Sequence, residues 1–243
     1  FKTSKEKDPA PQRKENFSEP TLEAVSALAV DTNRNLILFS KNADEIRPIA
    51  SLTKMVTAAT VLDNAKIDEI ASVSKQAIQN EGASGALKEG ETLTIYNLLA
   101  AALMESSNDA AYALAEYIGT KIISSQNIKA NTVSPNRVFI KTMNQKFNSL
   151  NLTQSNFTDS SGLEDSNSFS TVKDFVEFIK YLRKNPAYAP IWEIAQAKKI
   201  SATAENGIAA HEFISTNPFL NEYNNVIGGK TGYTNNALGN MLL

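Results

Sequence analysis

A serine and a lysine stand three positions apart in the segment Ser51-Leu52-Thr53-Lys54. Apolar residues follow at helical spacing, which predicts a helix over residues 51–65 with Ser51 as its starting residue. Residues three apart lie on one face of a helix, so the hydroxyl and the amine are within reach of each other. A lysine can take a proton from a serine nucleophile when burial or a second cation lowers its pKa. Taken alone, this spacing also fits a solvated helix turn.

Two further segments carry polar groups at places where a chain can turn side chains into a cleft. Ser106-Ser107-Asn108 interrupts two predicted helices, and its alternative interpretation is a helix cap. Lys230-Thr231-Gly232 closes a strand predicted to begin at Val226, and its alternative interpretation is a strand end with a turn glycine. Neither segment indicates a function by itself.

The composition excludes several other chemistries. The chain has no cysteine, which rules out a thiol nucleophile, a thiolate metal site and a disulfide framework. His211 is the only histidine, so a zinc site would rest on carboxylates, and we expect neither a metal nor another cofactor. A Ser-His-Asp triad would have to use His211, which we expect to be a surface or strand residue. The net charge of -2 gives no reason to expect a nucleic-acid partner.

Strands are predicted at both ends of the chain, with helices between them. The turn-forming segment Asp31-Thr32-Asn33-Arg34 separates two strand-like runs and predicts an antiparallel hairpin. The order of elements predicts one α/β (α+β) domain over residues 21–243, with an antiparallel sheet built from both chain ends and a helical lobe inserted at about 66–185. Strands are predicted at 24–30, 35–40, 211–215, 226–230 and 237–243, and helices at 51–65, 95–104, 109–118, 137–150 and 171–184.

Residues 1–20 alternate acidic and basic side chains and contain few apolar ones, so we expect a disordered polar tether. Such a leader can follow a membrane anchor or signal, or it can be a plain terminal tail, and the sequence leaves both open. The chain begins at Phe1 rather than Met, from which we expect that an upstream piece was removed. It contains no run of 18 apolar residues that would span a bilayer.

The three polar segments together, in this chain order, resemble the motif set of penicillin-binding proteins and serine β-lactamases. Within that superfamily the chain is similar to the low-molecular-mass D-alanyl-D-alanine carboxypeptidases, from about Ala27 to Leu243. The resemblance implies a β-lactamase/transpeptidase-like fold. It is carried by Arg47-Pro48-Ile49-Ala50-Ser51-Leu52-Thr53-Lys54-Met55, Leu87-Lys88-Glu89-Gly90-Glu91, Ser107-Asn108-Asp109-Ala110-Ala111, Ser161-Gly162-Leu163 and Gly228-Gly229-Lys230-Thr231-Gly232-Tyr233-Thr234.

The resemblance implies a catalytic group of four residues. Ser51 would attack the carbonyl between two terminal D-alanines, and Lys54 would take its proton. Ser106 would relay a proton towards the leaving amine, while Asn108 would orient Lys54 and the substrate amide. The charge of Lys230 would help to keep Lys54 neutral.

The resemblance also implies how the substrate is held. Lys230 and Thr231 would bind the terminal carboxylate. Gly232 would leave room for a substrate lying antiparallel along the strand. The oxyanion would sit between the backbone N–H groups of Ser51 and Tyr233, each worth on the order of 3 kcal/mol. The implied partners are a peptidoglycan stem peptide ending in D-Ala-D-Ala and β-lactam antibiotics, and the implied location is the cell envelope, outside the cytoplasmic membrane.

One departure from the family pattern stands out at the end of the chain. The family normally adds two strands and a C-terminal helix after Lys-Thr-Gly, so the last strand and that helix are expected to be missing here. The missing strand would lie between the Lys-Thr-Gly side and the N-terminal hairpin, and its absence would leave exposed sheet edges. We expect truncation rather than a second chain filling this gap.

Two rival functions remain open at this stage. A class A-like β-lactamase needs a glutamate that activates water, and Glu164 with Asn167 could be offered for that role. A catalytically silent peptidoglycan-binding homologue would keep the cleft without turnover. Rapid penicillin turnover would favour the first rival, and absence of a covalent penicillin adduct would favour the second.

Overall fold

The computed structural model describes residues 11–14, 16–79, 81–82, 85–129 and 132–243. Half of the predicted tether, residues 1–10, lies outside the described residues, as does residue 15. Its described part, 11–14 and 16–20, is exposed and forms neither helix nor strand. No helix within the described part of the chain is both long and apolar enough to cross a membrane.

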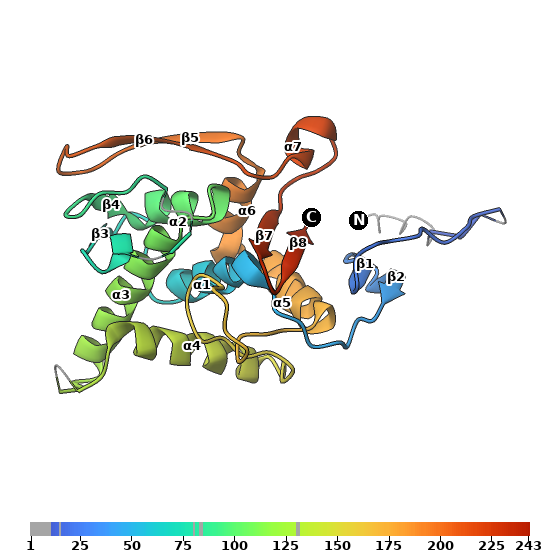
Figure 1. Cartoon of the computed structure of the whole chain (residues 1–243), viewed down its shortest axis with the longest axis horizontal. Helices are drawn as coiled ribbons and strands as arrows, with labels where there is room; N and C mark the ends of the chain where they lie inside the picture. Colours follow the sequence, from blue (N-terminus) through green and yellow to red (C-terminus); the bar gives the residue numbers. More distant parts are fainter. Residues whose placement is uncertain (1–10, 15, 80, 83–84, 130–131) are drawn as a thin grey trace, which may run out of the picture.

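Helices form the main body of the protein (Figure 1). Helix α1 (Thr53–Leu62) is buried along almost its whole length and contacts α2 (Ile95–Met104), α3 (Asn108–Ser125) and α4 (Pro135–Ser149). Apolar side chains from all four helices join one core. Helix α1 is therefore a fixed central element, and a side chain at its start is held by the core behind it.

Two further helices complete this body. Helix α5 (Val172–Lys184) begins at the cap residue Thr171, whose hydroxyl accepts the N–H of Asp174. Helix α6 (Ala189–Gln196), which the sequence did not predict, follows the short turn Pro186–Tyr188 and packs on α2. A one-turn helix, α7 (Phe219–Glu222), and two 3-10 turns, Ala50–Leu52 and Ala77–Gln79, are also present.

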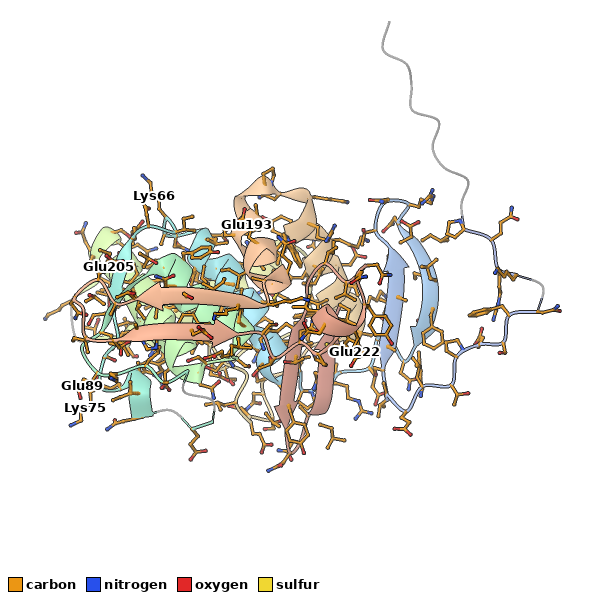
Figure 2. All side chains as sticks on the ribbon, turned by 90° about the horizontal axis from the view of Figure 1, so that it is seen from above. Lys66, Lys75, Glu89, Glu193, Glu205 and Glu222 are labelled. Atoms are coloured by element: carbon orange, nitrogen blue, oxygen red, sulfur yellow. The ribbon has the colours of Figure 1, made fainter. Side chains whose placement is uncertain are left out.

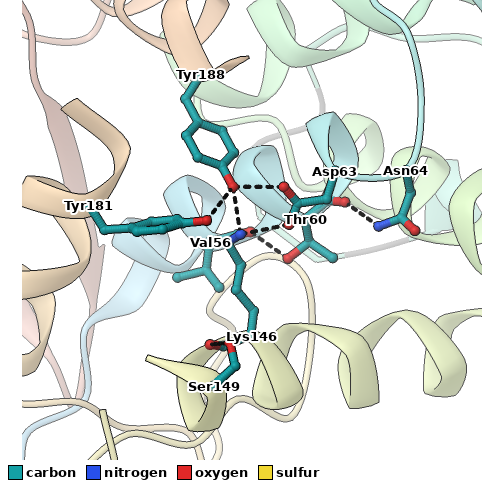
Figure 3. Close-up of polar contacts among 8 residues, drawn as sticks. All are labelled: Val56, Thr60, Asp63, Asn64, Lys146, Ser149, Tyr181 and Tyr188. Carbon is teal, nitrogen blue, oxygen red and sulfur yellow. Dashed lines mark hydrogen bonds and ion pairs between the residues drawn. The ribbon is translucent and has the colours of Figure 1, made fainter. Parts of the chain in front are cut away.

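A polar cluster fastens the end of α1 to the neighbouring helices (Figure 3). The Tyr188 hydroxyl donates to Asp63 Oδ1 at 2.7 Å and accepts from Lys146 Nζ at 2.7 Å. Lys146 also pairs with Asp63 Oδ2 at 2.6 Å, and the Tyr181 hydroxyl lies 3.2 Å from that of Tyr188. Tyr188 is fully buried whereas Asp63 reaches the surface, and their bonds stabilise α1 against α4 and α5.

The strands of the described residues form four antiparallel pairs, three of which are hairpins. They are β1 (Ala27–Asp31) with β2 (Leu36–Lys41), β3 (Ile70–Ser72) with β4 (Thr92–Thr94), β5 (Lys199–Thr203) with β6 (Ala210–Ile214), and β7 (Lys230–Thr234) with β8 (Leu238–Leu242). Helices mixed with antiparallel strands confirm the predicted fold class. Figure 2 looks along a perpendicular direction and shows charged side chains pointing outward from this body, among them Lys66, Lys75, Glu89, Glu193, Glu205 and Glu222.

One predicted strand limit is wrong, and the strand pairs at the two chain ends do not join in the described residues. The hairpins β1–β2 and β7–β8 are separate two-stranded sheets, because no strand edge of one exchanges backbone hydrogen bonds with the other. Both views place β1–β2 at the far end of the molecule, beyond β7–β8 (Figures 1 and 2). Strand β7 begins at Lys230 rather than at Val226, since Gly228 has a φ of +146°, which ends extended pairing. A further strand between the hairpins stays a prediction.

Candidate active site

The serine of the first segment lies in a tight turn rather than within α1 itself. Ser51 occupies the 3-10 turn Ala50–Leu52, immediately before the helix. Ala50 has a φ of +46°, a left-handed conformation that costs a non-glycine residue on the order of 1 kcal/mol. This turn leaves the Ser51 side chain half-buried, whereas Lys54 is fully buried one turn along α1.

The amine of Lys54 lies at the centre of the site. Its Nζ is 2.9 Å from Ser51 Oγ, 2.7 Å from Asn108 Oδ1 and 2.8 Å from the backbone carbonyl oxygen of Ser161. Burial lowers the pKa of Lys54 well below its usual value, and the nearby charge of Lys230 lowers it further. The carboxylate of Asp159 acts in the opposite direction. The site therefore favours an uncharged amine beside the serine.

The second segment serves as both a cap and a part of the site. Ser107 is the N-cap of α3, and its hydroxyl accepts the N–H of Ala110 at 3.1 Å. Ser106 just before it has a φ of +61°, and Asn108 just after it is buried. This strained connection turns Ser106 and Asn108 towards the two lysines. Asn108 also donates through Nδ2 to the carbonyl of Glu81, which fixes which end of the amide faces Lys54.

The third segment brings a second buried lysine to the same place. Lys230 at the start of β7 is 1% exposed, and its Nζ donates to Ser106 Oγ at 3.0 Å. It also donates to the carbonyl oxygen of Thr231 at 2.7 Å. Burial lowers the pKa of Lys230 to about 7. The Thr231 hydroxyl lies beside this lysine in sequence and 2.9 Å from the hydroxyl of Thr216.

The glycine of this segment allows the strand to approach the serine turn. A Cβ at Gly232 would lie 2.9 Å from the backbone nitrogen of Ser51, closer than side chains tolerate. The next residue, Tyr233, has an exposed side chain and a backbone that continues β7. All eight residues predicted for the site thus lie on segments that meet around Ser51, although they span residues 51–233 of the sequence.

Other contributors were not predicted as site residues. The sequence segment Ser161-Gly162 was noticed only for its resemblance, yet the Ser161 carbonyl contacts Lys54. Asp159 shapes this loop by accepting the N–H groups of Ser161 and Gly162. Thr216 gave no sequence signal, because it lies in an irregular stretch and contacts the site through tertiary structure alone.

Of the two expectations for His211, the structure matches the strand residue. It is a strand residue, in β6, but its side chain is only 6% exposed, where its Nε2 lies 2.8 Å from Glu91 Oε2. In the described ranges no group of three acidic or histidine side chains could hold a metal ion. The assembled groups can support acyl transfer: a hydroxyl, an amine whose pKa is lowered, polar side chains and a second buried lysine.

The amino-acid sequence is similar to a known peptidase family and to several of its members. Residues 13–243 match peptidase family S11, described as D-alanyl-D-alanine carboxypeptidase. A D-alanyl-D-alanine endopeptidase of Escherichia coli K12 is 31% identical over 223 residues, covering 90% of this chain and 66% of that protein. The D-alanyl-D-alanine carboxypeptidase DacF of Bacillus subtilis 168 is 28% identical over 233 residues, 94% of this chain and 55% of that protein. The chain thus spans about two thirds or less of the length of these relatives.

A solved structure shares the fold. The Streptomyces K15 DD-transpeptidase superposes with a TM-score of 0.79 at 25% identity, covering 92% of this chain and 85% of that one. The resemblance drawn from the three motifs is therefore confirmed independently by sequence and by structure. Because the family match extends across nearly all of the residues, this chain belongs to the D-alanyl-D-alanine carboxypeptidase family.

Proposed function

We propose that this protein is a serine D,D-carboxypeptidase that removes the terminal D-alanine from peptidoglycan stem peptides through an acyl-enzyme. The observation that carries the proposal is the buried Lys54 amine, held 2.9 Å from Ser51 Oγ. We propose the same serine as the residue that penicillins acylate. We propose the cell envelope, outside the cytoplasmic membrane, as its location, because peptidoglycan lies there.

The contacts of Lys54 support its role as the base. A neutral amine has two N–H groups and one lone pair. Asn108 Oδ1 and the Ser161 carbonyl can only accept, so they use both N–H groups. The lone pair is then left for the Ser51 hydroxyl, which is the one partner that can donate. Attack by Ser51 on the substrate carbonyl accordingly transfers its proton to Lys54.

The second lysine supplies the group that recognises the end of the substrate. A terminal carboxylate between Lys230 and Thr231 would restore the full charge of Lys230, because an opposite charge raises the pKa of a buried lysine. Ser106 Oγ is 3.0 Å from Lys230 Nζ, and Lys230 is near enough to Lys54 for its charge to lower the pKa of Lys54. We propose that Ser106 relays to the leaving D-alanine amine the proton that Lys54 took from Ser51, as the amide bond breaks.

The charge that develops on the substrate oxygen needs donors fixed in advance. The backbone N–H of Ser51 lies beside Gly232, and the N–H of Tyr233 follows on β7. We propose these two groups as the oxyanion donors. Water then attacks the ester on Ser51, with Lys54 again taking a proton, and the shortened peptide leaves.

A second candidate is cleavage of cross-linked peptides. It is favoured by the relative of 31% identity, which is named a D-alanyl-D-alanine endopeptidase. Both reactions break a bond after D-alanine and release an amine that carries a carboxylate nearby. Incubation with a cross-linked muropeptide dimer and with a monomeric pentapeptide separates them by the product formed.

Labelling with a fluorescent penicillin tests the proposal. We expect a covalent adduct that persists for minutes, located on Ser51 by peptide mass spectrometry, and release of D-alanine from the pentapeptide. Ser51→Ala should form no adduct, and Lys54→Met should acylate about 10²- to 10⁴-fold more slowly. Rapid release of hydrolysed penicillin would instead indicate a β-lactamase, and a folded parent protein with no adduct would indicate a silent homologue.

A further inference from the structure

A cavity of about 330 Å³ opens next to the nucleophile turn. Ala50 and Gly162 form its side towards Ser51, and Thr234 at the end of β7 borders it as well. The lining also includes the apolar side chains of Ile46, Leu163 and Phe169. Its charged members are Arg47, from the stretch before the turn, and Glu164 and Asp165, from the loop that follows Gly162. None of these three charged residues was assigned a role in the proton transfers above.

The proposed reaction fixes which part of a substrate reaches this cavity. With the terminal carboxylate at Lys230 and Thr231, a peptide lying antiparallel to β7 passes Ser51 at Gly232 and continues towards Thr234. An extended chain advances roughly 3.3 Å per residue, on the substrate as on the strand. The third residue counted from the carboxyl end therefore lies beside Thr234, where its side chain can enter the cavity.

Acidic groups on one side of the cavity are held in place. The two carboxylate oxygens of Glu164 accept the backbone N–H of Asn236 at 2.9 Å and its Nδ2 at 3.1 Å. Asp165 Oδ1 accepts the N–H of Asn167 at 2.8 Å. A carboxylate oxygen can accept two hydrogen bonds, so both side chains can still accept a bond from an ammonium group.

A cation borders the same cavity. The backbone of Arg47 is fixed by two hydrogen bonds with Ser170, at 2.8 and 2.9 Å. Its Nη2 donates to Glu45, and its side chain is 43% exposed, so a ligand can still reach part of the guanidinium. A guanidinium with a donor to spare suits a carboxylate.

We infer that this cavity binds the side chain of the third stem-peptide residue and prefers one that ends in both an ammonium and a carboxylate, as in diaminopimelate. The ammonium would face Glu164 and Asp165, and the carboxylate would face Arg47. A lysine side chain would satisfy only the acidic half. This inference rests on the proposed carboxypeptidase reaction, which sets the direction of the substrate.

Three pentapeptides that differ only at the third residue test the inference: meso-diaminopimelate, L-lysine and norleucine. We expect kcat/KM for D-alanine release to fall about fivefold to tenfold at each step of this series, as one charged contact after another is lost. Turnover of the three peptides within twofold of one another would overturn the inference. In that outcome, D-alanine release and penicillin labelling still report on the proposed function independently.

Substitutions in the cavity test which side chains cause the preference for the third peptide residue. Arg47→Gln should lower the ratio of kcat/KM for diaminopimelate over lysine by about fivefold to tenfold. Glu164→Gln should lower the ratio for lysine over norleucine by a similar factor. The matched control Glu205→Gln changes an exposed glutamate on the β5–β6 hairpin and should leave both ratios unchanged. Ratios in Arg47→Gln and Glu164→Gln equal to those of the parent would place the specificity elsewhere.

Discussion

At the scale of single residues, two buried lysines must differ in protonation at the same pH: Lys54 must be neutral and Lys230 must be positively charged. Lys54 accepts a proton only when neutral, so activity requires a pH above its lowered pKa. Lys230 attracts a carboxylate only when charged, so binding requires a pH below its pKa of about 7. The site reaches this separation with one physical cause, desolvation, assisted at Lys54 by the charge of Lys230.

We predict a bell-shaped pH profile of kcat/KM, because this parameter reports the free enzyme. On the acid side it falls as Lys54 becomes protonated, and on the alkaline side it falls above about pH 7 as Lys230 loses its proton. Lys230→Arg should remove the alkaline limb, since a guanidinium stays charged throughout. If kcat/KM fell at the same alkaline pH in the parent and in the variant, the loss of the Lys230 proton would not be its cause.

At the scale of elements, the loop of Gly162 and the turn of Ser51 pack without spare room. Gly162 has a φ of +82°, and a Cβ there would lie 1.9 Å from the carbonyl oxygen of Ala50 and 2.8 Å from Thr53 Oγ1. The loop thus sets the position of the nucleophile turn from outside, as the core behind α1 sets it from within.

We predict that Gly162→Ala lowers the free energy of unfolding by about 2–4 kcal/mol and slows penicillin acylation, because the turn must move to admit the methyl group. Gly207→Ala is the matched control. Gly207 has a similar φ of +71° but no atom within 4 Å of the added Cβ, so only the backbone strain of about 1 kcal/mol remains. Urea unfolding and acylation rates measure both; equal losses in the two variants would rule out the steric argument.

A second contact between elements lies at the other end of α1. Tyr188→Phe removes the hydroxyl that joins Asp63, Lys146 and Tyr181, whereas Tyr181→Phe removes one bond of 3.2 Å. We predict that Tyr188→Phe lowers the free energy of unfolding by about 1–3 kcal/mol and that Tyr181→Phe lowers it by less than half as much. Urea unfolding at pH 7 measures the two values. Equal effects would mean that the cluster does not act through Tyr188.

Helices in which apolar residues recur at regular spacing over ten or more residues could be predicted from the sequence. Helix α2 matches its predicted limits, Ile95–Met104, and α4 and α5 lie within two residues of theirs. The three-residue strands β3 and β4 were missed because so short a segment shows no period. Helix α6 and strand β5 were missed because prolines and mixed composition hide their pattern.

The site could be predicted only as a set of residue types. Its motifs identified the eight side chains, but their convergence depends on contacts between residues 54 to 124 positions apart. Ala50 and Ser106 have positive φ values that turn the first and second segments towards the site, and alanine and serine rarely adopt such values. Carbonyl groups such as those of Ser161 and Glu81 carry no sequence signal, because every residue has one.

At the scale of the whole molecule, the site places charged groups inside the fold, and these groups tie stability to pH. Asp109 in the first turn of α3 is 1% exposed, and its Oδ1 has no partner in the described part of the chain. Burial raises its pKa from 3.8 to about 6. The folded state therefore binds this proton more tightly than the unfolded state does. The resulting stability is fully present below about pH 4 and is lost as the pH rises through 6.

We predict that Asp109→Asn gains stability relative to the parent as the pH rises, since the amide never acquires the buried charge. The difference in the free energy of unfolding should grow by roughly 2 kcal/mol between pH 4 and pH 7.5, given about 1.4 kcal/mol per unit of pKa shift. Urea unfolding at the two pH values measures it. Glu205→Gln, which changes an exposed carboxylate, should show no such growth. A difference for Asp109→Asn that stays constant with pH would mean that the parent holds this carboxylate charged at no cost, through a partner that the helix start provides.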